Sequence, residues 1–403
     1  MAPSGIGSFE ESDYRNHEIP SRLFSASNPP SLDDFDRLIS ETKAIHYPLS
    51  TRITSSVPIY ELPEFSSLTP GQRSALQDEW YHILLSGPGV FVTKYLFKDI
   101  SLIEKVSTVF ASIIAKEKEI SGQRGDHFAG SGANDRIWNS FSKHCMQDSE
   151  SFLKYYSNPW LPLICAAWLG PQYRLTAQVN VVKPGAKAQI SHRDYHIGFQ
   201  GNGACARFPK AIHIASQFLT LQGAVAHSDM PVESGPTRLL PFSQKFEEGY
   251  MAYRIPEHQD YFLKKYVSIP LEKGDGLFFN PALFHAAGQN DSKDVMRSAN
   301  LLQISSAFGK PMETIDTIPL IEATWNSLAD LHHREGLSEE VRAFVGHVAE
   351  GYPFPTNLDR RVPETAGMAP SSEQDLLIKS LENDWTKDQV LDGLQKLQGD
   401  SRA

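Results

Sequence analysis

The sequence predicts an α+β protein in which a β-rich barrel or sandwich is flanked by helical segments. From Gln172 to about residue 307, short apolar runs alternate with turns made of Gly, Pro, Asn and Asp. This spacing is typical of an all-β sandwich or barrel. Before and after this region, apolar residues recur at three- and four-residue intervals, which is the pattern of amphipathic helices.

The composition excludes several classes of protein. The chain has 403 residues, 40% hydrophobic and 21% charged, with a formal net charge of −10. That length is enough for one large or two ordinary domains with a sizeable core. Because the sequence has no cluster of Lys and Arg, we do not expect a nucleic-acid partner. No apolar run approaches the roughly 18 residues of a membrane span, so we expect no membrane association.

Cysteine usage bears on the compartment. The three cysteines, Cys145, Cys165 and Cys205, form no Cys-x-x-Cys motif. An odd number without such a pattern argues against a disulfide framework and against a thiolate zinc site. We therefore expect a reducing, cytoplasmic location. The final Ser-Arg-Ala is similar to an SKL-type peroxisomal signal but departs from it at the last residue, so it does not support a peroxisomal location.

The N-terminal third of the chain contains the first predicted helices. Residues 1–65 are rich in Ser, Pro and charged residues, and we interpret them as a partly irregular arm with a short helix capped by Ser31 or Asp33. The next helix is expected to start at Thr69, because a capping residue followed by Pro is a start signal. It should end before the Gly-Pro-Gly that follows Ser86.

The elements that follow are predicted from their hydrophobic periodicity. GVFVTKYLF alternates as a strand does, and residues 100–116 and 151–169 have the spacing of amphipathic helices. In the C-terminal part, Ser338 opens one helix, and Thr386 forms a capping box with Gln389 before another. The predicted strands of the β-rich region are YRLTAQVNVV, AKAQISHRDYHIGF, AIHIASQFLTLQGAVA, TRLLPF, YVSIPL, DGLFFN, ALFHAAG and VMRSANLLQISSAF.

Three residues are of the types that form a metal site. His192 and Asp194 lie two residues apart in SHRDYHIGF, and on an extended strand such residues project from the same face. His285, in NPALFHAAGQN, would complete the two-His, one-carboxylate set of open non-haem Fe(II) sites. Strands that are distant in sequence can face each other across a barrel. The alternative is that these histidines are ordinary core or surface residues.

Arg297 stands in an otherwise apolar predicted strand, twelve residues after His285. A buried guanidinium needs a partner, and a carboxylate suits it best. A structural salt bridge or exposure at a strand edge is the alternative, but together with the histidines a bound dicarboxylate is favoured. Gln178 and Asn180 share one face of RLTAQVNVVKP. Their amides would suit the same co-substrate, or they could form a cross-strand hydrogen bond.

Together, these residues resemble the phytanoyl-CoA dioxygenase family of Fe(II)- and 2-oxoglutarate-dependent oxygenases. The resemblance covers about residues 70–308 and rests on four pieces in order: QVNVVKPGA, SHRDYH, ESGPTRLLPFSQKF, and NPALFHAAGQN with Arg297 following. The third piece departs from the family pattern at Ser234, Phe242 and Gln244. These departures concern substrate and lid geometry rather than the chemistry.

The resemblance implies specific roles and a specific fold. It implies that His192, Asp194 and His285 bind Fe(II), that Arg297 holds the distal carboxylate of 2-oxoglutarate, and that O₂ is the other co-substrate. The core would be a double-stranded β-helix, a jelly roll of the cupin type, with helices packed on one side. We expect a dioxygenase domain at 66–308, after the arm at 1–65, and a C-terminal helical extension at 309–403 that could cover the active-site mouth or form a homodimer.

The expected function is oxidation of an unactivated C–H bond in a small organic substrate, by hydroxylation, desaturation or cyclisation, with release of succinate and CO₂. A specialised metabolite, an amino acid and a fatty-acyl compound are all compatible, while the lack of a basic cluster argues against a CoA thioester. A cupin-like metal enzyme that does not use 2-oxoglutarate and a non-enzymatic binding protein are the alternatives. No catalytic role beyond the metal ligands is assigned, including to Tyr195, His196 and Phe199.

Overall fold

Two β-sheets of very different size form the centre of the protein. The computed structural model describes residues 20–41, 46–121, 134–363 and 367–402. Within these ranges the larger sheet has the order β1-β2-β3-β9-β6-β11-β5-β4, and the smaller sheet has the order β10-β7-β8. The strands are β1 (Arg52–Thr54), β2 (Val57–Glu61), β3 (Val90–Lys94), β4 (Asn134–Ile137), β5 (Arg174–Val182), β6 (Thr220–Ala226), β7 (Arg238–Leu240), β8 (Val267–Ser268), β9 (Gly276–Phe279), β10 (Phe284–Ala286) and β11 (Arg297–Ser305).

The two faces of the larger sheet have different surroundings. On β11, which pairs antiparallel with β5 and β6, Leu302 and Ile304 point into an apolar core shared with the helices. Arg297 and Leu301 lie on the opposite face and line a cavity. Strand geometry requires this alternation. One face of the sheet therefore supports the helical layer, and the other is available for a site.

A second apolar cluster joins the two sheets. It includes Val92 of β3, Leu277 of β9 and Ala299 of β11 together with Leu239 of β7. Closure of the larger sheet by the smaller one encloses the cavity between them. The predicted α+β fold, a double-stranded β-helix core with flanking helices, is confirmed.

The first long helix begins where the sequence predicts. α2 (Pro70–Leu85) is capped by Thr69, whose side chain accepts from the N–H of Gln72 while the Gln72 side chain accepts from the N–H of Thr69. This reciprocal pair satisfies two N–H groups that a helix start leaves without partners. Trp80 of this helix is fully buried and stacks on Phe91 of β3, so α2 is held against the larger sheet.

Residues 151–169 form two helices, and the prediction of one continuous helix is wrong. α5 (Ser149–Tyr156) and α6 (Trp160–Leu169) are separated at Ser157–Pro159. Proline lacks an N–H and disfavours helical geometry in the residue before it. The side chain of that residue, Asn158, instead accepts from the N–H of Trp160 and donates to the carbonyl of Leu96. The preceding helices are α3 (Ile100–Ser121) and α4 (Ser140–Gln147).

Two predicted strands are also wrong, at least in part. In AKAQISHRDYHIGF, only His192 forms a β-bridge, because β10 is short, and the short 3₁₀ helix η2 (His196–Phe199) follows. In AIHIASQFLTLQGAVA, the first half is the helix α8 (Lys210–Ser216) and only the second half is β6. Apolar runs of this length fit either structure. Further short helices of this region are α7 (Asn202–Cys205), α9 (Gly249–Ala252), α10 (Pro256–Lys265), η3 (Val232–Ser234) and η4 (Ser243–Lys245).

Part of the predicted arm belongs to the sheet. β1 and β2 lie within residues 52–61 and extend the larger sheet, with β2 parallel to β3; the turn η1 (Phe65–Ser67) follows. The short helix α1 (Leu32–Glu41) begins as predicted at Ser31, whose hydroxyl accepts from the N–H of Asp34. Phe35 anchors this helix against Phe246 and Phe284. Residues 1–19 and 42–45 of the arm lie outside the described ranges.

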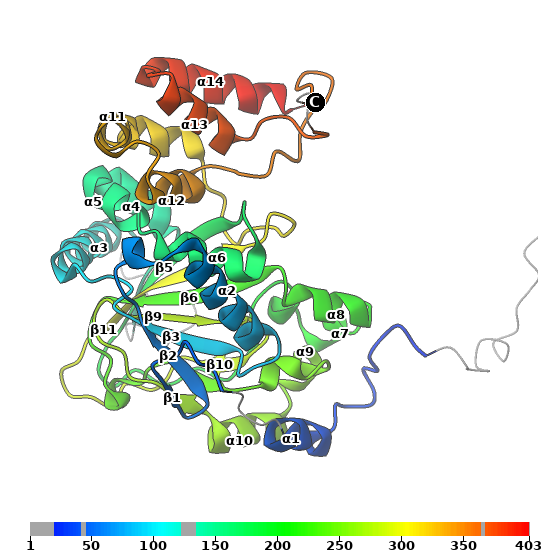
Figure 1. The fold of residues 1–403 in the computed structure, drawn as a ribbon. Coiled ribbons are helices and arrows are strands. Elements are labelled where there is room, and N and C mark those ends of the chain that lie inside the picture. The colour runs from blue at the N-terminus through cyan, green and yellow to red at the C-terminus, as the bar shows by residue number, and fades with distance from the viewer. Residues whose placement is uncertain (1–19, 42–45, 122–133, 364–366, 403) are drawn as a thin grey trace, which may run out of the picture.

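The C-terminal part is helical, as predicted. Figure 1 shows α11 (Thr317–Glu335), α12 (Glu339–Val348), α13 (Glu373–Glu382) and α14 (Lys387–Asp400) stacked at one end of the molecule. Ser338 caps α12, and Thr386 forms the predicted capping box with Gln389 at α14. The three cysteines are free and buried. Across the described ranges, we find no helix with the length and apolar character needed to cross a membrane.

Candidate active site

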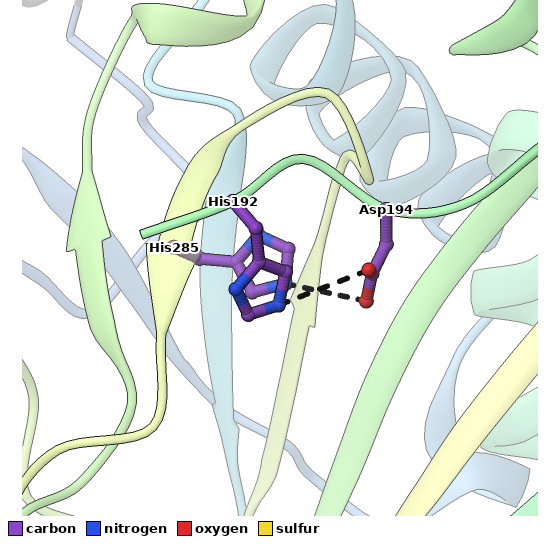
Figure 2. Close-up of side chains that lie close together, drawn as sticks. All are labelled: His192, Asp194 and His285. Atoms are coloured by element: carbon purple, nitrogen blue, oxygen red, sulfur yellow. Dashed lines mark ion pairs between the residues drawn. The ribbon is translucent and has the colours of Figure 1, made fainter. Parts of the chain in front are cut away.

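The three predicted metal ligands converge in the structure. The Nε2 atom of His192 lies 3.8 Å from one carboxylate oxygen of Asp194, and the Nε2 atom of His285 lies 3.5 Å from the other. One ligand atom from each residue falls within 4.8 Å of the others. Figure 2 shows the two imidazoles side by side and facing the carboxylate. Two imidazoles and one carboxylate, with room for further ligands, are the donor set that non-haem Fe(II) requires.

Backbone pairing holds the two ligand-bearing segments together. His192 and His285 exchange both backbone hydrogen bonds, at 2.9 and 3.1 Å, which makes the bridge between the ligand loop and β10. The N–H of Asp194 donates to the carbonyl of Pro281 at 3.0 Å. The predicted shared face of residues 192 and 194 therefore arises in an extended loop segment rather than in a long strand.

Both histidines are oriented by hydrogen bonds from their outer nitrogens. The Nδ1 atom of His192 lies 2.9 Å from the carbonyl of Ile190, and that of His285 lies 2.8 Å from the carbonyl of Leu283. A carbonyl can only accept, so Nδ1 carries the proton and Nε2 presents a lone pair. This outer hydrogen bond is the arrangement that prepares a histidine for a metal. The residues present therefore fit an iron ion.

Gln222 supports the carboxylate and was not identified from the sequence. Its amide nitrogen on β6 donates to Asp194 Oδ2 at 2.7 Å. Burial opposes ionisation of Asp194, but the two imidazoles and this amide outweigh it and hold the pKa of the carboxyl below its usual value. Burial lowers the pKa of His192. Both groups are therefore kept in the protonation states that bind a metal. The alternation along β6 is the signal that places Gln222 on the cavity face.

Arg193, between the two ligands in sequence, points away from them. Its fully buried guanidinium donates to the carbonyls of Ser243 and Phe246. A Cβ atom at Gly249 would lie 1.9 Å from the Arg193 guanidinium carbon, so only glycine fits there. These contacts fix the loop that carries His192 and Asp194 to the loop before α9.

Arg297 lines the same cavity as the three ligands. It is only 6% exposed, and no described Asp or Glu lies within ion-pair distance of it. Burial, with the nearby charge of Arg238, lowers the pKa of the guanidinium to about 10. Two neighbouring cations without a carboxylate create a strong preference for an anion. The structural salt bridge considered for Arg297 is absent among the described residues.

Gln178 and Asn180 both lie on the cavity face of β5, but their surroundings differ. The oxygen of Gln178 accepts from Arg136 of β4 at 2.8 Å, and its nitrogen contacts the sulfur of Met312. This is the cross-strand hydrogen bond that the sequence left as an alternative. The side-chain oxygen of Asn180 is buried and has no hydrogen-bond partner. An amide oxygen only accepts, as do the oxygens of 2-oxoglutarate, so a co-substrate contact of Asn180 has to come from its amide nitrogen.

The cavity that contains these residues has a volume of about 610 Å³, within the usual range for small-molecule sites. Its lining includes the three ligands and Arg297, buried apolar side chains such as Leu277 and Phe279, and the exposed apolar side chains Ile190 and Phe199. The site thus combines metal-compatible polar groups with apolar walls.

Comparison with known families decides the class of this protein. A family model described as phytanoyl-CoA dioxygenase (PhyH) matches residues 87–299, more than half of the chain, and the match includes the ligand set and Arg297. The chain belongs to the phytanoyl-CoA dioxygenase family. This family comprises non-haem Fe(II)- and 2-oxoglutarate-dependent oxygenases that also use O₂, so the predicted family is confirmed, and the predicted cofactors are those of the family.

The relatives with the most similar sequences include fungal dioxygenases. Dioxygenase andF of Emericella variicolor is 26% identical over 181 residues, which are 41% of this chain and 57% of that protein. Dioxygenase olcK of Penicillium canescens is 25% identical over 262 residues, which are 62% of this chain and 76% of that protein. The chain spans only 55–62% of the length of andF and of two further dioxygenases, cdmD of Talaromyces verruculosus and trt7 of Aspergillus terreus.

The solved structures that resemble this protein are less similar to it in sequence than the dioxygenases above. The non-haem α-ketoglutarate-dependent carbocyclase SnoK from nogalamycin biosynthesis aligns with a TM-score of 0.41 and 18% identity, covering 60% of this chain and 85% of that chain. The epimerase SnoN in complex with Fe³⁺, α-ketoglutarate and nogalamycin RO aligns with a TM-score of 0.40 and 17% identity, covering 58% and 85%.

Proposed function

We propose that this protein is an Fe(II)- and 2-oxoglutarate-dependent dioxygenase that oxidises an unactivated C–H bond of a small organic molecule. The observation that carries the proposal is the convergence of His192, Asp194 and His285 in one cavity with the unpaired cation Arg297. The two histidines and one carboxylate are the ligand set that iron requires. The guanidinium of Arg297 is the group that suits a carboxylate of 2-oxoglutarate.

In this proposal, Nε2 of each histidine and the Asp194 carboxylate hold the iron. Arg297 binds the distal carboxylate of 2-oxoglutarate, and Asn180 donates from its amide to an oxygen at the other end of that molecule. Gln222 keeps Asp194 oriented toward the metal. When bound, iron with 2-oxoglutarate and O₂ supplies the oxidising power and yields succinate and CO₂. The protein contributes orientation and, through its apolar walls, exclusion of water.

The substrate is proposed to be a small organic molecule such as a specialised metabolite, an amino acid or a fatty-acyl compound. Hydroxylation, desaturation and cyclisation all begin at the same activated position, and the placement of the substrate decides among them. We expect no nucleic-acid partner, given the net charge of −10 and the lack of a Lys and Arg cluster, and no membrane partner, because no apolar run approaches the length of a membrane span. A cytoplasmic location is also part of the proposal.

We further propose the division into an arm at 1–65, a dioxygenase domain at 66–308 and a helical extension at 309–403. One observation favours a role for the extension in the active site. The linker that leads to it passes the cavity, where Met312 contacts Gln178, and Glu313 accepts from the N–H of Asn139. A homodimer through the helices α11–α14 is a second role, which sedimentation of the full chain would test.

A cupin-like enzyme that does not use 2-oxoglutarate would have no need of Arg297, and a binding protein would have no need of an open metal site. An anaerobic titration separates these functions. Fe(II) and 2-oxoglutarate together should produce a weak visible absorption band in the wild type. The band should be absent in His192→Ala and retained in the matched control His196→Ala, since His196 stacks on Tyr195 outside the ligand set. A band absent from the wild type would refute the proposal.

With the band established, exposure to O₂ in the presence of candidate compounds should produce succinate in equal amount to the oxidised product. Specialised metabolites, amino acids and fatty-acyl compounds would each be tested as a class. Oxidation of a compound without consumption of 2-oxoglutarate would favour the cupin-like alternative instead.

A further inference from the structure

Besides Arg297, the arginines Arg136, Arg193 and Arg254 line the cavity, and neither the iron site nor the co-substrate uses them. Arg254 lines the cavity, on the turn between α9 and α10. The proposed iron ligands His192, Asp194 and His285 line the same cavity, so one bound molecule can contact Arg254 and also approach the metal position.

The guanidinium of Arg254 is held in place without being neutralised. One nitrogen donates to the carbonyl of Gly198 at 2.9 Å, and the other terminal nitrogen contacts Asn202 Oδ1 at 3.3 Å. The group also lies over the ring of Tyr253, with its central carbon 4.1 Å from the ring centroid. Each of these partners is uncharged. No described carboxylate is within ion-pair distance of Arg254, and a guanidinium has five N–H donors in all.

The charges elsewhere in the cavity are accounted for. Under the proposed function, iron, Asp194, 2-oxoglutarate and Arg297 together carry no net charge. Arg136 has the nearby carboxylate of Glu313, whose pKa its charge lowers against the larger, opposite effect of burial. Arg193 points into the protein and donates to backbone carbonyls. Of these three arginines, Arg254 is thus the one that has neither a nearby carboxylate among the described residues nor a fully buried guanidinium.

Exposed apolar side chains line the same cavity as Arg254. Two large hydrophobic side chains that line the cavity are unusually exposed, Phe199 at 53% and Ile190 at 74%. Phe199 follows Gly198, to which Arg254 is hydrogen-bonded, and Ile190 accepts the hydrogen bond that orients His192. Exposed apolar groups at the rim of a cavity usually mark a binding surface. A cation beside such a rim suits a ligand with both an apolar body and an anionic end.

We propose that the substrate carries a carboxylate, which Arg254 binds, on an apolar body that contacts Phe199 and Ile190. This inference rests on the proposed function and makes its substrate class narrower. A guanidinium that is held in place attracts a carboxylate through two charge-assisted hydrogen bonds, and these two bonds also fix the orientation of the carboxylate. Anchoring one end of the substrate would set which C–H bond lies near the iron.

Three probe acids of increasing bulk, laurate, abietate and cholate, would each be compared with the corresponding primary amide. Binding would be measured by calorimetry on metal-free protein saturated with 2-oxoglutarate, so that no turnover occurs and the co-substrate site is filled. We expect at least one acid to bind about tenfold or more tightly than its amide, as a charged hydrogen bond implies. Arg254→Met should remove this preference, and Arg254→Lys should retain part of it.

Two further variants make the test specific. Arg207→Met removes a nearby exposed arginine that does not line the cavity, and it should leave the preference unchanged. If no acid binds, if acids and amides bind equally, or if Arg297→Ala rather than Arg254→Met abolishes the preference, the inference is wrong. Because the calorimetry requires no iron, its outcome is independent of the visible band that tests the proposed function.

Discussion

The two faces of strand β11 differ in how their polar groups are satisfied. On the helix-facing side, the Asn300 amide donates to the hydroxyls of Tyr155 and Tyr156, and its oxygen accepts from Ser140. On the cavity side, the side-chain oxygen of Gln303 is buried without a hydrogen-bond partner, as is that of Gln222, which is its pair on β6. Buried polar groups are normally paired.

This difference distinguishes a structural polar group from one that is available to a ligand. Successive side chains of a strand point to opposite faces. Along β11, side chains that pack in the core therefore alternate with side chains that line the cavity. Substitutions on the helix side should therefore change stability without changing ligand binding, and substitutions on the cavity side should do the reverse. The following variants test that separation, beginning with the largest expected effect.

Removing a metal ligand should abolish activity and leave the fold intact. In His285→Ala we expect no detectable iron after reconstitution and no succinate formation. The unfolding transition of the metal-free protein should stay close to that of the wild type, because the imidazole faces the cavity rather than the core. Iron content, succinate and a urea transition measure the three properties. Full activity in this variant would exclude His285 as a ligand.

On β11, Leu302→Ala should cost about 2–5 kcal/mol in the free energy of unfolding, as for other large-to-small core changes. Leu302 is fully buried in the helix-side core. Leu301→Ala is the matched control, since Leu301 is next to it, faces the cavity and is only partly buried. Its stability loss should be smaller. Equal losses of unfolding free energy would mean that side chains on the two faces of β11 contribute equally to stability.

Arg297→Ala should weaken 2-oxoglutarate binding by about 2–5 kcal/mol, the range for losing one partner of a buried charge pair. The amount of 2-oxoglutarate needed for half-maximal absorbance in the anaerobic complex measures this effect. Arg297→Lys should recover part of the affinity, since it keeps the charge but not the bidentate geometry. An unchanged requirement would show that Arg297 does not hold the co-substrate.

The smallest expected effect concerns Gln222, which contacts Asp194 rather than the metal. Gln222→Leu should lower iron affinity about 10–100-fold, as for other groups that orient a ligand. Gln303→Leu is the control, because this cross-strand neighbour makes no contact with Asp194 that we observe. Competition with a chelator would measure both. A similar loss in the two variants would assign the effect to a general change in the cavity.

The sequence was sufficient for features that depend on local chemistry. The caps at Thr69, Ser338 and Thr386 and the strand ranges around β5 and β11 follow from residue types at fixed offsets. The three proposed ligands could also be selected, because few residue sets suit iron. The resemblance of four ordered pieces to a family then gave the jelly roll.

Features that depend on tertiary contacts were not accessible in this way. The stretch around His192 alternates like a strand, yet β10 offers it only one bridge. The break at Pro159 in the helix expected at 151–169 is different, because proline is a local signal that the apolar spacing masked. Gln222 was missed because its role comes from Asp194, which it meets only in the fold. Arg254 was missed because the packing of the turn between α9 and α10 brings it to the cavity.

The central claim is that His192, Asp194 and His285 hold one iron ion. Anomalous scattering at the iron absorption edge, from crystals grown anaerobically with Fe(II) and 2-oxoglutarate, tests it most directly. We predict a single strong peak bounded by the Nε2 atoms of both histidines and the carboxylate of Asp194, with 2-oxoglutarate extending from it toward Arg297. A peak at any other group of residues, or no peak between these three side chains, would contradict the account.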